Sequence, residues 1–162
     1  MERLIHYIEG IGDLRGLPFL RRLGSLCLLI TVPSYVISYL SVRFLPPQIA
    51  SDPYLSLGTI IFSVTLGPLM ETYLMRLLFF IFRKFMHETA AISLCAALII
   101  GGLHALQVWG LYAIWPFFVL GICYFRWEKD SVTRAMIGTT LLHSLVNAIG
   151  CWAIVAQLTF GE

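Results

Sequence analysis

Long apolar segments separated by short polar stretches make up most of the chain. The segments cover residues 23–45, 54–82, 89–108, 111–125 and 135–160. A helix needs about 20 mostly apolar residues to cross a bilayer, and most of these segments approach or exceed that length. Pro33 lies inside the first segment and Gly67-Pro68 interrupts the second, and a proline removes one helical hydrogen bond. The pattern predicts an all-α polytopic membrane bundle of about five transmembrane helices over residues 23–162.

Residues 1–22 have a different character. They mix Leu4, Ile5 and Ile8 with charged side chains, and they lack the apolar core and small-residue cleavage site of a signal peptide. We therefore expect an N-terminal cytoplasmic or interfacial segment that is retained. A short helix lying in the membrane interface and a poorly ordered tail are both compatible with this pattern.

The composition agrees with a membrane protein. Hydrophobic residues make up 59% of the chain and charged residues 12%, and the mean hydropathy is +0.85. These values exclude an ordinary soluble domain. We expect the lipid bilayer, and no nucleic acid, as a partner. The four cysteines lie in apolar segments without C-x-x-C spacing, which favours small buried hydrophobes over disulfides or zinc ligands.

Basic residues are distributed unevenly between the predicted loops. They lie before the first segment, between the second and third, and between the fourth and fifth, as Arg3, Arg15, Arg21, Arg22, Arg83, Lys84, Arg126, Lys129 and Arg134. These three regions share one side if the segments alternate, and the opposite side holds Arg43 alone. Positively charged loops remain cytoplasmic. We therefore expect a cytoplasmic N-terminus and an external C-terminus, in a membrane that is most simply a prokaryotic plasma (inner) membrane.

Several polar residues lie within the apolar segments at similar predicted depths. A helical rise of ~1.5 Å per residue places Glu71 ~18 Å, His104 ~21 Å, His143 ~12 Å and Asn147 ~18 Å from the cytoplasmic end, with Arg76 at ~10 Å. An ionisable group near the bilayer centre costs about 2.5–3.5 kcal/mol on insertion scales and is a functional site by default. The five residues are therefore predicted to converge between the middle of the bilayer and its cytoplasmic third.

Helical spacing refines this expectation. His143 and Asn147 are four residues apart and share one helix face. Gly101-Gly102 precedes His104 and allows another helix to approach closely. Arg76 lies about 140° around the helix from Glu71, so it is expected beside the site or toward the substrate rather than as a bidentate partner of Glu71.

The polar positions resemble three motifs of the CPBP intramembrane proteases, a family that includes CAAX prenyl endopeptidases and bacteriocin-processing or self-immunity proteins. The matching stretches are Glu71-Thr72-x-x-x-Arg76, His104 after its glycines, and His143-x-x-x-Asn147. The resemblance covers about residues 63–150. This chain has Thr72 where the family has a second glutamate, and Ile100 where it often has phenylalanine.

The resemblance implies a role for each matching residue. Glu71 would activate a water molecule, and His104 would help to hold and deprotonate it. His143 and Asn147 would stabilise the oxyanion. Arg76 is the motif arginine, and Thr72 would not supply the charge that could position it.

The predicted function is that of an intramembrane endopeptidase. Its substrate would be a membrane-anchored protein or peptide, such as a lipidated or hydrophobic C-terminal tail or a leader peptide. The preferred mechanism requires no cofactor. Zinc is the alternative, because Glu71, His104 and His143 are suitable ligand types that leave a position for water. The chain has no His-Glu-x-x-His helix, which would supply two ligands and a base together.

Two other functions fit the same residues. A non-catalytic binding or self-immunity protein of the same fold is compatible with Thr72 in place of the second acid. A small proton-coupled transporter is compatible with Glu71, His104 and Arg76 near mid-membrane. Either histidine alone could simply join two helices by a hydrogen bond, and Arg76 could extend to the cytoplasmic surface.

Overall fold

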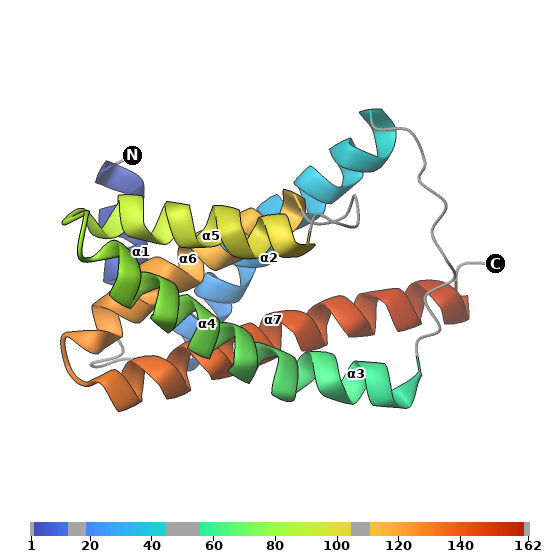
Figure 1. Ribbon diagram of the computed structural model, residues 1–162. Coiled ribbons are helices and arrows are strands. Elements are labelled where there is room, and N and C mark those ends of the chain that lie inside the picture. Colours follow the sequence, from blue (N-terminus) through green and yellow to red (C-terminus); the bar gives the residue numbers. More distant parts are fainter. Residues whose placement is uncertain (1, 13–18, 45–55, 105–110, 161–162) are drawn as a thin grey trace.

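The computed structural model describes residues 2–12, 19–44, 56–104 and 111–160 (Figure 1). These residues form seven helices and no strand, in agreement with the all-α prediction. The helices are α1 (Glu2–Gly12), α2 (Phe19–Phe44), α3 (Leu57–Val64), α4 (Leu66–Phe82), α5 (Thr89–His104), α6 (Leu111–Glu128) and α7 (Val132–Phe160). Residues 105–108 of the predicted third segment lie outside the described residues, as does Arg15.

The five apolar segments correspond to α2, to α3 with α4, and to α5, α6 and α7. Successive segments run in alternating directions along the long axis of the bundle (Figure 1). Two stretches are long and apolar enough to cross a membrane, Leu57–Phe82 and Val132–Ala153, and α5 is a shorter apolar helix. This supports a membrane protein by length and composition.

The N-terminal segment is helical and packs on the bundle. In α1, Ile8 is fully buried in the core, and Leu4 and Ile5 pack against it. The helix contacts α2 and α6, while Glu2 and Arg3 are exposed. Because its apolar face covers α6, α1 is part of the bundle. Residues 2–12 therefore form a packed helix and not a poorly ordered tail.

The second segment breaks at Thr65, which separates α3 from α4 with φ −119° and ψ −79°. Pro68 has no N–H to donate to the carbonyl of Val64, so the break falls at the turn before the proline. The Thr65 hydroxyl donates to the Ile61 carbonyl at 2.6 Å. From α7, the Asn147 side-chain amide donates to the Ser63 carbonyl at 2.8 Å. Side chains thus satisfy backbone oxygens at the interruption.

Pro33 does not end α2, which continues through it to Phe44. The proline cannot donate to the carbonyl of Leu29, four residues earlier. The indole Nε1–H of Trp115, on α6, donates to that oxygen at 2.8 Å. A neighbouring helix therefore supplies the donor that the proline lacks, as is common in membrane bundles.

Helices α5 and α6 approach closely at glycines. A Cβ at Gly101 would lie 2.5 Å from Cγ1 of Ile114, and one at Gly121 would lie 2.9 Å from the Ser93 side chain. A Cβ at Gly102 would meet nothing within 4 Å. The close approach predicted for the Gly101-Gly102 pair is therefore made by Gly101, and it fixes the end of α5 that carries His104.

The cysteines agree in part with the prediction of buried hydrophobic side chains. All four are free thiols; Cys27 and Cys123 are buried, and Cys95 and Cys151 are half-buried.

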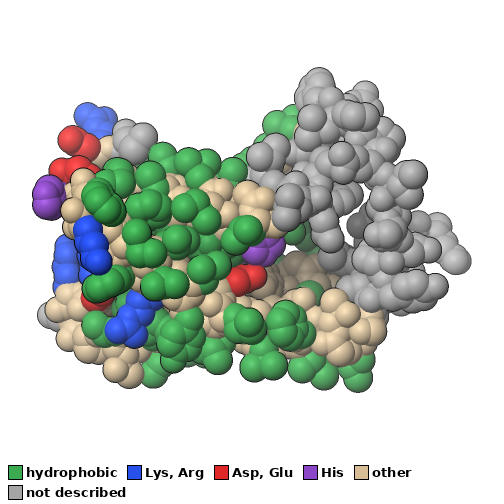
Figure 2. Space-filling model, in the orientation of Figure 1, with side chains coloured by type: hydrophobic (Ala, Val, Ile, Leu, Met, Phe, Trp, Pro, Cys, Tyr) green, Lys and Arg blue, Asp and Glu red, His purple; other side chains and the backbone are tan. Residues whose placement is uncertain are grey.

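Charged side chains gather at one end of the bundle, where α4 joins α5 and α6 joins α7 (Figure 2). There the Arg83 guanidinium pairs with the Glu128 carboxylate and packs over the Phe125 ring. Arg134 and Asp130 form a second pair at 2.9 Å. Arg83 and Arg134, from two of the basic loops used to predict the orientation, therefore lie at the same end of the molecule.

Candidate active site

Glu71 contacts histidines from two other helices. Its Oε1 lies 3.2 Å from Nε2 of His104, on α5, and its Oε2 lies 3.3 Å from Nε2 of His143, on α7. Each imidazole thus contacts a different carboxylate oxygen. The structure brings together three of the residues that the sequence analysis placed at one depth.

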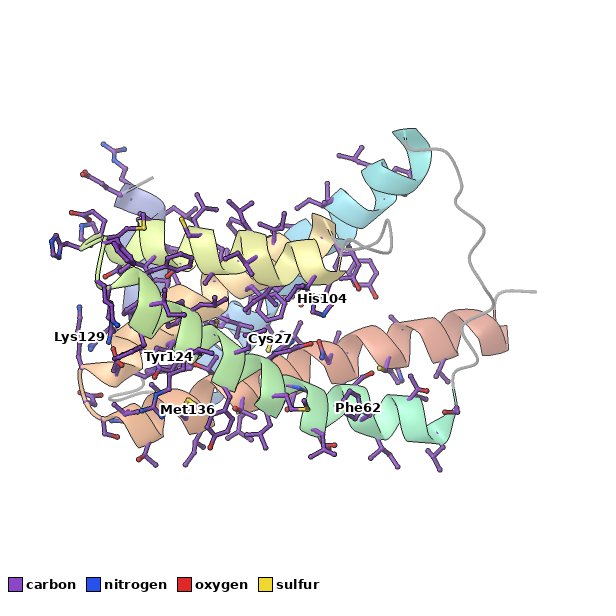
Figure 3. The ribbon with its side chains drawn as sticks, viewed as in Figure 1. Cys27, Phe62, His104, Tyr124, Lys129 and Met136 are labelled. Carbon is purple, nitrogen blue, oxygen red and sulfur yellow. The ribbon has the colours of Figure 1, made fainter. Side chains whose placement is uncertain are left out.

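The three side chains differ in exposure. The side chain of His143 is 6% exposed, that of Glu71 24%, and that of His104 41%. Figure 3 labels His104 at the end of α5, on the side that faces α7. Figure 2 shows an acidic and a histidine side chain together on this face, beside hydrophobic side chains. The site is therefore closed around His143 and open beside His104.

The contacts of His104 define its protonation. Its Nδ1 lies 2.9 Å from the Ile100 carbonyl, and a carbonyl only accepts, so Nδ1 carries a proton. An ionised carboxylate also only accepts. The contact between Glu71 and His104 Nε2 therefore holds one further proton, either on an imidazolium or on a neutral Glu71. Glu71 and His104 therefore share one hydrogen bond.

Asn147, which the motif pairs with His143 at the oxyanion, binds the backbone at the α3–α4 break. Although it shares a helix face with His143, its amide nitrogen donates to Ser63 at the α3–α4 break. Position along the helix predicted its depth but not its rotation relative to α3. Because a side-chain amide has two N–H groups, this bond leaves one donor for another acceptor.

Thr72 and Arg76 lie on other sides of α4. Thr72 is buried, and its hydroxyl donates to the Pro68 carbonyl of its own helix at 2.7 Å. Arg76 is exposed, which agrees with its predicted rotation of about 140° away from Glu71. Neither side chain therefore extends the carboxylate–histidine cluster.

The cluster does not have the arrangement of a zinc site. Ligand nitrogens lie about 2.0–2.1 Å from zinc and converge on it. Here both His104 nitrogens already face oxygen atoms, Ile100 O and Glu71 Oε1. Within the described ranges, no group of three His, Cys, Asp or Glu residues is placed to hold a metal ion.

Phe117 is a site neighbour that sequence reasoning did not single out. Its ring centroid lies 5.2 Å from that of His143 and 5.7 Å from that of His104. It is 3% exposed, on α6. An apolar residue within an apolar segment carries no sequence signal of such a role.

The chain matches no protein-family model, no curated protein and no solved structure. Its resemblance to the CPBP proteases therefore stays a prediction from the motifs.

Proposed function

We propose that this protein is an intramembrane endopeptidase that uses Glu71 as a general base. The observation that carries the proposal is the contact of one carboxylate with two imidazoles, contributed by three helices of an apolar bundle. Burying such groups among apolar helices is costly and is typical of functional sites. Proton exchange between a carboxylate and an imidazole is also what general acid–base catalysis requires.

The reaction begins when a water molecule enters between Glu71 and His104. The Glu71 carboxylate takes a proton from the water molecule. The water oxygen then bonds to the scissile carbonyl carbon. The His143 N–H donates to the resulting oxyanion, and a single donor of this kind is worth about 2.7–4 kcal/mol in a dry site. The C–N bond then breaks as the leaving amine takes the proton, which Glu71 returns directly or through His104.

Asn147 is proposed to support this site in two ways. Its bond to Ser63 holds the break that precedes Glu71, and its second amide N–H is a donor for the oxyanion. Arg76 is a candidate contact for substrate on the exposed side of α4. Thr72 holds a carbonyl of its own helix and takes no part in proton transfer.

The bundle is proposed to cross the membrane five times, through α2, α3–α4, α5, α6 and α7. The charged end would face the cytoplasm of a prokaryotic cell. Glu71 would then lie between the middle of the bilayer and its cytoplasmic side. The exposed side chains beside the site include Met70, 62% exposed, and Leu103, 57% exposed. Such a surface suits a substrate that is already in the lipid, with a lipidated or hydrophobic C-terminal tail or a leader segment.

The test is hydrolysis by the purified protein in liposomes. The probes are quenched peptides with a farnesylated C-terminus, a hydrophobic C-terminal helix or a leader helix, incubated in water enriched in oxygen-18. Each cleavage event places one labelled oxygen in the new carboxylate, which mass spectrometry detects. Glu71→Gln should abolish incorporation, whereas Glu88→Gln, an exposed acid outside the site, should not. Undiminished labelling with Glu71→Gln would reject the proposal.

A non-catalytic binding protein is the second candidate, and the burial of Thr72 favours it. The family motif has a second acid at this position, and here a hydroxyl is engaged with its own backbone. A binding protein would retain a protective or binding phenotype in cells with Glu71→Gln, and none of the probe peptides would acquire oxygen-18.

A further inference from the structure

Phe117 lies between the two imidazoles of the candidate site, yet the proposed reaction does not use it. Its ring is nearly perpendicular to that of His143, at 85°, and is inclined at 47° to that of His104. An edge-on contact between rings of this kind is a preferred and directional arrangement. One buried ring on α6 therefore contacts a histidine on α5 and another on α7.

We infer that Phe117 is a positioning residue that holds both imidazoles against Glu71, and this inference rests on the proposed hydrolytic site. The terminal torsion of a histidine is broad, so a single contact at one nitrogen does not define the orientation of the ring. His104 has a second anchor in the Ile100 carbonyl. Among the residues that the structure describes, none forms a comparable backbone hydrogen bond with the His143 ring, which has the edge-on contact with Phe117 instead, so His143 depends on Phe117 more.

The position of Phe117 is itself well defined. The preceding Pro116 is buried, and Trp115 is hydrogen-bonded across to α2. On the α5 side, Gly101 allows Ile114 to lie in direct contact. These contacts fix the turn of α6 that carries Phe117. A ring presented by such a rigid turn can restrict the rotation of two side chains at once.

The test compares Phe117→Leu with Phe118→Leu. Both remove a buried ring from adjacent positions of α6, but the Phe118 ring neighbours Trp115, at 6.0 Å, rather than a histidine. The full chain is labelled with ¹³C,¹⁵N-histidine in detergent micelles. It contains four histidines, His6, His87, His104 and His143, which single substitutions assign. Hydrolysis of the best peptide probe is measured in parallel.

With Phe117→Leu, the ring signals of His104 and His143 should shift because they lose the ring current of Phe117, and His143 should shift more. The signals of His6 and His87 should stay in place. The kcat should fall about ten- to hundredfold, the scale of a small misplacement of catalytic groups, with KM nearly unchanged. Phe118→Leu should move neither the site histidine signals nor kcat.

Unmoved His104 and His143 signals in Phe117→Leu, or equal shifts in Phe118→Leu, would overturn the inference. So would shifted signals with an unchanged kcat. If the wild-type protein hydrolyses no probe, the proposed function fails instead, and the line shapes of the histidine signals decide the inference. Broadened or multiple His143 ring signals in Phe117→Leu would show that Phe117 orients this imidazole, and a single narrow set like that of the wild type would overturn the inference.

Discussion

The indole N–H of Trp115 donates to the carbonyl oxygen of Leu29, the oxygen that Pro33 leaves without a helical donor. A side chain of α6 thus completes the backbone hydrogen bonding of α2. The equivalent device at the α3–α4 break is the bond from Asn147 to Ser63. At Pro33 and at the α3–α4 break alike, a side chain from a later helix donates a hydrogen bond to a backbone oxygen.

The first prediction concerns the partnership of Trp115 and Pro33. Trp115→Phe keeps an aromatic ring but leaves the Leu29 carbonyl unsatisfied, at a cost of about 1–3 kcal/mol. In a Pro33→Ala background, the new N–H can bind that carbonyl, so Trp115→Phe should cost much less. Unfolding titrations of the four proteins in mixed micelles measure this coupling as a double-mutant cycle. Equal costs in both backgrounds would show that Trp115 acts through packing alone.

The second prediction concerns the contact between α5 and α6. Gly101→Ala should destabilise the protein by about 1–3 kcal/mol, the usual cost of overpacking, because its Cβ would collide with Ile114. It should also weaken hydrolysis by displacing His104. Gly102→Ala is the matched control: its Cβ meets open space, and alanine favours helix by about 1 kcal/mol relative to glycine. The midpoint of thermal unfolding in detergent should fall for Gly101→Ala only.

The third prediction separates the two roles of Asn147. Asn147→Leu should reduce stability by about 1–3 kcal/mol, because the Ser63 carbonyl loses its donor. Ser63→Ala should have little effect, since Asn147 binds the backbone and not the Ser63 hydroxyl. If Asn147 also donates to the oxyanion, kcat should fall about 10²–10³-fold at temperatures where the variant is fully folded. A stable Asn147→Leu protein would contradict the bracing role.

The fourth prediction concerns membrane orientation. In a chain whose native cysteines are replaced by alanine, single cysteines at His87 and Ser131 should react with an impermeant maleimide only in inverted vesicles. A cysteine at Ser56, just before α3, should react only from the outside of intact cells. These outcomes are expected because the α4–α5 and α6–α7 connections lie at the same end of the bundle. Labelling of all three positions from one side would contradict alternating spans.

The succession of helices could be predicted because apolar length and polar breaks are local properties of the chain. The α3–α4 break does not lie at the residues that mark it in the sequence. Gly67-Pro68 marks the signal, but the helix breaks at Thr65, because a proline removes the bond to the residue four positions earlier. Such displacements are small and have a simple physical reason.

Depth along the helices also predicted that Glu71, His104 and His143 would meet. It did not predict which side chains each helix would turn toward its neighbours. That rotation depends on close packing, such as Gly101 against Ile114, and a single sequence does not reveal it. The partner of Asn147 and the placement of Phe117 were missed for this reason.

The bonds from Trp115 and Asn147 have a consequence for the order in which the protein assembles. They connect residues 86 and 84 positions apart. A ribosome therefore makes α2 and α3 long before it makes the donors that complete their backbone hydrogen bonding. An unsatisfied carbonyl in lipid costs several kcal/mol. Until α6 and α7 have been made, the carbonyls of Leu29 and Ser63 need water or another polar partner. The last helices to be made therefore complete the hydrogen bonding of the first.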